Sequence, residues 1–177
     1  FMASPRLRAD VVHLPFDTDL FASGTVYVAK DQSVPSTADL SSFKKSVLRV
    51  PRIDLRGGRY WLNVQVTTDS SQGQWALGNL GSYIERVELF AWSDGQLQHG
   101  VSGQFEKEDY PLHYGANFEM RPGHVYDLWI LYDSRYFTGI PTAHVVPKVD
   151  YEHSVLLDNL LVIGCLGAIV ILAAYNL

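Results

Sequence analysis

The chain has 177 residues and a formal net charge of −5, and its 14 Lys and Arg residues are scattered, which argues against nucleic-acid binding. The single cysteine, Cys165, excludes a disulfide framework and a CxxC motif. The length favours one domain plus an appendage, and a domain of about 150 residues buries a core without disulfides or metals.

Residues 1–9 contain no pattern from which a helix or a strand can be predicted. Residues 1–9 lack the apolar core of a signal peptide. We interpret them as a leader or remnant that precedes the folded domain.

Apolar and polar residues alternate with period 2 in several segments, which predicts strands. The turn signal Ser93-Asp94-Gly95 predicts a hairpin that returns along residues 96–103. One short helical turn is expected near residues 37–43, capped by Ser36 or Thr37. Many short strands predict an all-β, antiparallel sandwich or barrel over residues 10–152. The clearest segments are 25–30, 59–68, 83–92 and 125–133.

Three of these segments have one aliphatic face and one face that mixes indole rings with amides and charged groups. Indole rings stack on the C–H faces of sugars, and polar groups hold the hydroxyls, so this face predicts a small-molecule site, above all for a carbohydrate. The alternative is that the tryptophans fill the gap between two sheets, because Trp is usually largely buried. The expected ligand-binding residues are Trp61, Asn63, Gln65, Arg86, Glu88, Trp92, Asp127 and Trp129.

The C-terminal segment is strongly apolar, and residues 160–174 carry no charge, amide or hydroxyl. A membrane-spanning helix needs roughly 20 mostly apolar residues, so we expect a stalk and a truncated transmembrane helix over residues 153–177. The alternative is a buried C-terminal helix of a soluble domain. No cluster of Lys or Arg precedes the run, which places the folded part outside the cytoplasm.

No common catalytic motif is present, and we expect no catalytic residue and no metal ligands among the six histidines. A third hypothesis, an enzyme on a sandwich scaffold, would use Glu88 and Asp127 as a glycosidase pair. Two clusters of acidic residues have two interpretations. We favour solvated loops, and the alternative is a Ca²⁺ site. No other cofactor is expected. These clusters hold Asp17 and Asp19, and Glu106, Glu108 and Asp109.

Four stretches, taken in order, resemble the periplasmic type-2 sensor domain of bacterial seven-transmembrane receptors with diverse intracellular signalling modules. They are VYVAKD (26–31), GRYWLNVQV (58–66), IERVELFAWSDG (84–95) and GCLGAIVILAAYNL (164–177). The last resembles the start of the first membrane helix of that family. The chain departs from the family pattern at Asn63, where the family often has Arg, and in YPLHYGANFEM (110–120), which lacks an Arg-x-Pro pattern.

The resemblance implies a jelly-roll sandwich similar to carbohydrate-binding modules, in a bacterial inner membrane with the domain facing the periplasm. It also implies signalling through the first transmembrane helix to a cytoplasmic output, such as a histidine kinase or a cyclase that makes c-di-GMP. We therefore expect a ligand-sensing domain that is not itself an enzyme. The alternative is a protein-interaction or homodimerisation module without a small-molecule ligand.

Overall fold

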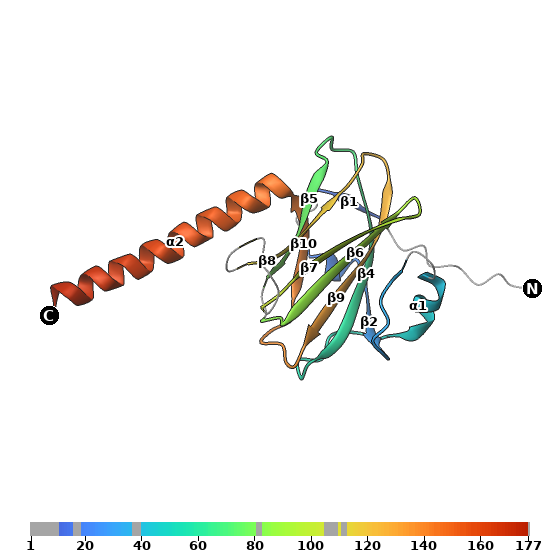
Figure 1. Ribbon diagram of the computed structural model, residues 1–177, viewed down its shortest axis with the longest axis horizontal. Coiled ribbons are helices and arrows are strands. Elements are labelled where there is room, and N and C mark those ends of the chain that lie inside the picture. The colour runs from blue at the N-terminus through green and yellow to red at the C-terminus, as the bar shows by residue number, and fades with distance from the viewer. Residues whose placement is uncertain are drawn as a thin grey trace, which may run out of the picture.

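The computed structural model describes residues 11–15, 19–36, 40–80, 83–104, 110 and 113–176. Two β-sheets pack face to face, and one long helix projects from them (Figure 1). The leader assigned to residues 1–9 lies outside the described residues, as do four of the five acidic residues named for Ca²⁺: Asp17, Glu106, Glu108 and Asp109.

The larger sheet has the strand order β3-β2-β4-β9-β6-β7, with β1 beside β4, and the smaller has the order β10-β5-β8. All described pairings are antiparallel except that of β1 with β4. The predicted sandwich is confirmed as two mostly antiparallel sheets, while the jelly roll and the likeness to carbohydrate-binding modules stay predictions. The strands are β1 Val12–Leu14, β2 Thr25–Ala29, β3 Val47–Arg49, β4 Gly58–Thr68, β5 Gln74–Leu80, β6 Arg86–Ser93, β7 Gln96–Ser102, β8 Tyr114–Glu119, β9 Val125–Ser134 and β10 Thr142–Pro147. The helices are η1 Leu20–Ala22, α1 Leu40–Ser46 and α2 Lys148–Tyr175.

The central pair of the larger sheet is β4 and β9, which pair over ten positions from Gly58 opposite Ser134 to Thr67 opposite Val125. We call the Ser134 end of the sandwich its lower end and the Val125 end its upper end, as they lie in Figure 1. The aliphatic faces of β4, β6 and β9 turn toward the smaller sheet and form the main core, as the alternation predicted. Among the residues of this core are Leu62, Val64, Leu89, Leu128 and Ile130.

The predicted hairpin joins β6 to β7 through Asp94 and Gly95. Both residues have positive φ, 49° and 76°. Positive φ at both central positions is typical of a type I′ turn, which matches the twist of the flanking strands. The hairpin prediction is therefore confirmed.

The smaller sheet was not predicted, and two of its strands, β5 and β8, carry glycines that weaken the strand pattern. Gly78 interrupts β5 and Gly115 interrupts β8, and the two glycines pair directly across these strands. Glycine in a strand often marks a place where another group approaches closely. Here that group is a side chain of α2.

The ring of Tyr151 lies on the surface left free by Gly78 and Gly115. A Cβ at either glycine would come within 2.6 Å of this ring. Tyr110 packs edge-on against the ring at a centroid distance of 4.8 Å, and the Tyr151 hydroxyl donates to the Tyr114 carbonyl at 3.2 Å. Burial, with a smaller contribution from Tyr110, raises the pKa of Tyr151 to about 12.

Helix α2 therefore has its base fixed to the domain. It begins at Lys148, directly after β10, so residues 148–152 belong to the helix, although the sequence placed them in the sandwich. Tyr151 and Val155 are its buried residues. No flexible linker separates the last strand from the helix.

We predict that Gly78→Ala loosens this attachment. The new Cβ overlaps the Tyr151 ring, and overpacking of this kind costs roughly 1–3 kcal/mol. Thermal unfolding of the full chain in detergent should show the loss. The matched control is Gly73→Ala, where a Cβ meets nothing within 4 Å. Equal effects of the two substitutions would show that the Tyr151 contact does not hold α2.

Candidate functional site

The outer face of the larger sheet, which points away from the smaller sheet, gathers the residues predicted to bind a ligand. Asn63 pairs with Trp129, and Gln65 pairs with Asp127. β6 continues these rows on the other side of β9. All the predicted residues thus lie on one face of three neighbouring strands: Trp61, Asn63 and Gln65 on β4, Asp127 and Trp129 on β9, and Arg86, Glu88 and Trp92 on β6.

The centre of this outer face is aromatic and is covered by α1. Phe43 points edge-on at the rings of both Trp61 and Trp129, with centroid distances of 5.0 Å. Trp61 is 0% exposed and Trp129 2% exposed, whereas Trp92 is half-buried. The two covered tryptophans are buried, as the alternative interpretation held, but they lie beneath α1 rather than between the sheets.

Both covered indoles keep an unpaired N–H group. Neither Nε1 of Trp61 nor Nε1 of Trp129 has a hydrogen-bond acceptor among the described residues. By contrast, Nε1 of Trp75 in the main core donates to the Gln72 carbonyl at 2.9 Å. A buried donor without an acceptor costs about 1–3 kcal/mol, so this small cluster is less well satisfied than the main core.

Asp127 links the sheet to α1. One carboxylate oxygen accepts from the Asn63 amide, and the other lies 3.1 Å from Nζ of Lys44. The Lys44 ammonium also lies over the Trp129 ring, 5.7 Å from its centroid. The carboxylate is mostly shielded while Lys44 is about half exposed, so the ion pair closes the edge of the aromatic centre.

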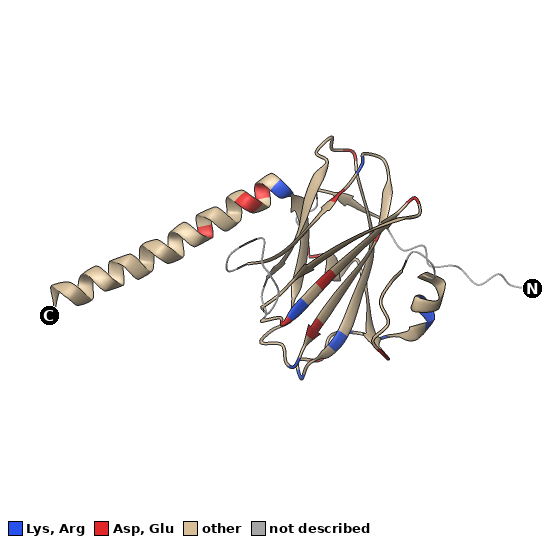
Figure 2. Ribbon diagram, viewed as in Figure 1, with Lys and Arg blue, Asp and Glu red and all other residues tan. Residues whose placement is uncertain are grey.

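A second group of charges crosses the lower part of the outer face, where Figure 2 shows acidic and basic patches on neighbouring strands. Glu88 is buried, and its two oxygens bind Nε of Arg86 and Nε2 of His99, each at 2.8 Å. Asp133 lies 3.1 Å from Nε of Arg59. Burial raises the pKa of Asp133, and the nearby arginines only partly offset this effect.

The two carboxylates suggested as a glycosidase pair are far apart. Asp127 is paired with Trp92, four positions along β6 from Glu88. At about 3.3 Å per strand residue this is roughly 13 Å, beyond the 5–9.5 Å that glycosidases use. Each carboxylate is also held by a cation. Glu88 and Asp127 are therefore not arranged as a glycosidase pair.

Metal binding has little support in the part of the chain that the structure describes. There, no three side chains of His, Cys, Asp or Glu lie close enough to hold a metal ion. Because most residues of the predicted Ca²⁺ clusters lie outside this part, the Ca²⁺ alternative stays a prediction.

The sequence prediction missed three residues of this face. The position of His99 could have been predicted from the sequence, because the Asp94-Gly95 turn fixes the β6–β7 register and pairs His99 with Phe90. The positions of Phe43 and Lys44 could not, because only tertiary packing brings α1 over β4 and β9. The one available signal was the pair of apolar residues, Leu40 and Phe43, in an otherwise polar helix.

Comparison with known families identifies the domain. The family model described as 7TMR-DISM extracellular 2 matches residues 25–141, which include β2 to β9, α1 and the whole outer face. The chain belongs to this family. The domain is thus an extracellular sensor domain of a seven-transmembrane receptor family, and it is not itself catalytic. No curated protein matches the chain.

Helix α2 fits this assignment. It is long and apolar enough to cross a membrane, and only 6% of its most apolar window is buried by the rest of the chain. Its charged residues are confined to the part next to the domain (Figure 2). The family and the helix together indicate a membrane-anchored protein.

We predict that Phe43→Ala uncovers the two tryptophans. Loss of this buried ring should lower the free energy of unfolding by about 3 kcal/mol and shift tryptophan emission to longer wavelength. Chemical denaturation followed by fluorescence measures both. The control is Leu48→Ala on neighbouring β3, where the side chain is 55% exposed and little change is expected. Unchanged emission in Phe43→Ala would contradict the covering role of α1.

We further predict that Asp133→Asn does not destabilise the domain at pH 7. A pKa raised in the folded state means that the folded protein binds the proton more tightly than the unfolded chain does, so ionised Asp133 lowers stability at neutral pH. The advantage of the Asn variant should shrink as pH falls through the raised pKa. Loss of a partly exposed ion pair subtracts at most about 1 kcal/mol.

Denaturation of both proteins between pH 7 and pH 3 tests this prediction. Asp31→Asn is the matched control of opposite sign, because hydrogen bonds from Ser33 lower the pKa of Asp31. Asp31→Asn should be less stable than the wild-type protein at pH 7, and this difference should become smaller in acid. A larger loss for Asp133→Asn than for Asp31→Asn at pH 7 would overturn the prediction.

Proposed function

We propose that this domain senses a small polar molecule, such as a carbohydrate, on the outer face of the larger sheet. Binding is transmitted through α2 to a cytoplasmic output, from a domain that faces the periplasm of a bacterial inner membrane. The observation that carries the proposal is the gathering of all eight predicted residues on three adjacent strands, around two buried indole N–H groups that have no acceptor in the described part of the chain.

The ligand competes with α1 for this face. When Phe43 leaves the two indole rings, the rings are free to stack on the apolar side of a sugar, and their N–H groups gain acceptors. When Lys44 leaves Asp127, the carboxylate and the Asn63 amide are free to hold hydroxyl groups. The closed arrangement is the ligand-free state, in which α1 occupies the site.

This mechanism predicts which substitutions tighten ligand binding and which weaken it. The apparent Kd is the intrinsic Kd divided by the fraction of molecules in the open state. Phe43→Ala raises that fraction, so it should tighten binding at least severalfold although it destabilises the fold. Asp127→Asn should weaken binding, because the lost hydrogen bond from the ligand to a charged group is worth about 1.5–3 kcal/mol. Loss of the partly exposed ion pair with Lys44, which favours the open state, offsets at most about 1 kcal/mol of this.

The test is a titration of the full chain in detergent, followed by tryptophan fluorescence, with monosaccharides, amino acids, small dicarboxylates and Ca²⁺. Asp69→Asn is the matched control, because Asp69 is exposed at the upper end and contacts only His13 in the described structure. A saturable change that Asp127→Asn weakens and Asp69→Asn does not supports the proposal. Silence across the panel in wild type and Phe43→Ala, with dimers in sedimentation, would favour a dimerisation module.

A further inference from the structure

The attachment of α2 holds the domain very close to the membrane. Val155 is the last residue of α2 buried against the domain, and the uninterrupted apolar run begins at Leu160. Five residues of continuous helix span about 7.5 Å. The polar layer on each side of a bilayer is roughly 5–7 Å thick. Part of the domain must therefore lie at the bilayer surface.

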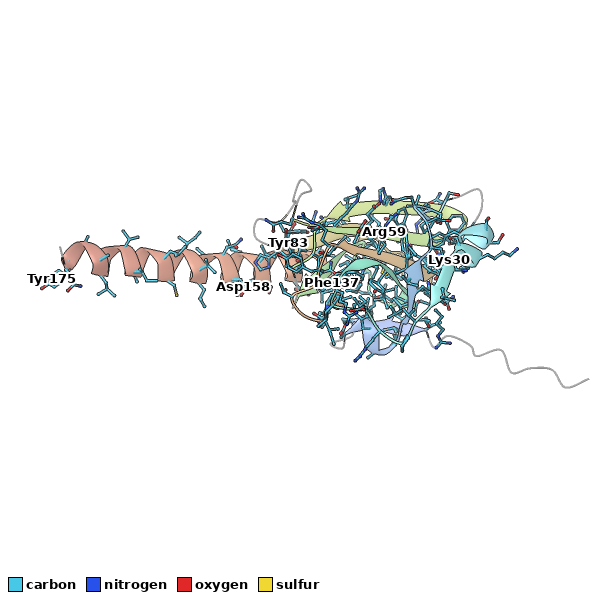
Figure 3. All side chains as sticks on the ribbon, turned by 90° about the horizontal axis from the view of Figure 1, so that it is seen from below. Lys30, Arg59, Tyr83, Phe137, Asp158 and Tyr175 are labelled. Carbon is cyan, nitrogen blue, oxygen red and sulfur yellow. The ribbon has the colours of Figure 1, made fainter. Side chains whose placement is uncertain are left out.

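The contacts of α2 show which end of the sandwich faces the bilayer. Lys148 reaches Gln74 at the upper end of β5, whereas Tyr151 reaches Tyr114, which pairs with Asn79 farther down β5. The helix thus runs from the upper toward the lower end of the smaller sheet as it leaves the domain. In Figure 3, labelled Tyr83 lies on the side of the domain nearest α2.

The lower end exposes a group of large apolar side chains on two touching loops. Leu55 is 46% exposed, Tyr136 50% and Ile140 60%. The loops are joined by a hydrogen bond of 3.0 Å from the Phe137 N–H to the Leu55 carbonyl. Tyr83 stacks on Tyr136 at 5.5 Å. Tyrosines with aliphatic neighbours are typical of the membrane–water interface, because their rings are apolar and their hydroxyls remain hydrated.

Beside these side chains is a cavity of about 810 Å³. Leu55 and Ile140 line it together with Ile53. Two arginines, Arg52 and Arg56, and one carboxylate, Asp54, also line it, so the charged residues of the lining are positive in sum. Guanidinium groups bind phosphate oxygens in a two-point geometry. A largely apolar cavity whose lining carries two arginines and one carboxylate fits the phosphate and glycerol region of an anionic lipid.

We propose that the lower end of the sandwich docks on the surface of an anionic bilayer. Leu55, Tyr136 and Ile140 enter the headgroup layer, and Arg52 and Arg56 contact lipid phosphates. The domain is then held at two places, by α2 and by this surface, so its orientation to the membrane is fixed. The inference depends on insertion of α2 and not on the ligand site proposed above.

The experiment uses the full chain with Cys165→Ser in nanodiscs of phosphatidylethanolamine and phosphatidylglycerol. A single cysteine introduced by Ile140→Cys carries a small fluorophore, and a lipid with a spin label on its headgroup is the quencher. The control is Val125→Cys, which is 47% exposed at the upper end. We expect at least twofold stronger quenching at position 140 than at position 125.

Two further variants complete the test. Ile163→Cys, quenched by a lipid labelled in its acyl chain, reports insertion of α2. Arg52→Glu with Arg56→Glu should lower quenching at position 140 to the level at position 125, and replacing phosphatidylglycerol with phosphatidylcholine should act in the same direction. Equal quenching at positions 140 and 125 would overturn the proposal, whether position 163 is buried in lipid or not.

Discussion

The register between β4 and β9 is the constraint on which the rest of this structure depends. With Leu62 opposite Ile130 and Asn63 opposite Trp129, most aliphatic residues of the two strands face the smaller sheet. The indoles face outward together with Asn63, Gln65, Asp127 and one aliphatic residue of the outer cluster, Leu131. Because side chains alternate along a strand, a slip of one residue would bury Asn63 and expose Leu62. The main core and the outer face therefore form together or not at all.

The same sandwich serves two attachments on opposite faces. On the outer face, α1 covers the tryptophans through one Phe and one ion pair. Two indole donors there find no acceptor among the residues that the structure describes. On the smaller sheet, α2 is fixed by Tyr151 on a pair of glycines, with a hydrogen bond and an aromatic neighbour. In the mechanism that we propose, the attachment of α1 yields to the ligand, and the attachment of α2 carries a displacement of the sheet into the membrane.

Several features of the fold could be predicted from the sequence, because they depend on residues that are close together in the chain. Alternation in residues 59–68 and 125–133 predicted both the strands and the division of their faces, since a pleated strand turns successive side chains to opposite sides. The residue types Asp94-Gly95 predicted the hairpin, because Asp and Gly tolerate the positive φ angles that a two-residue hairpin turn requires. Strands β5 and β8 were missed because Gly78 and Gly115 make room for the Tyr151 ring of α2, which is distant in sequence.

The sequence by itself determined the two-faced strands, the hairpin, the family and the apolar helix, because each rests on residue periodicity or on an ordered set of short motifs. Only the tertiary structure decided that Trp61 and Trp129 are covered, because Phe43 reaches them through packing across the sheet. It also decided that α2 starts at Lys148 and leaves toward the lower end of the sandwich, because the position of a helix on a sheet is set by contacts between distant residues.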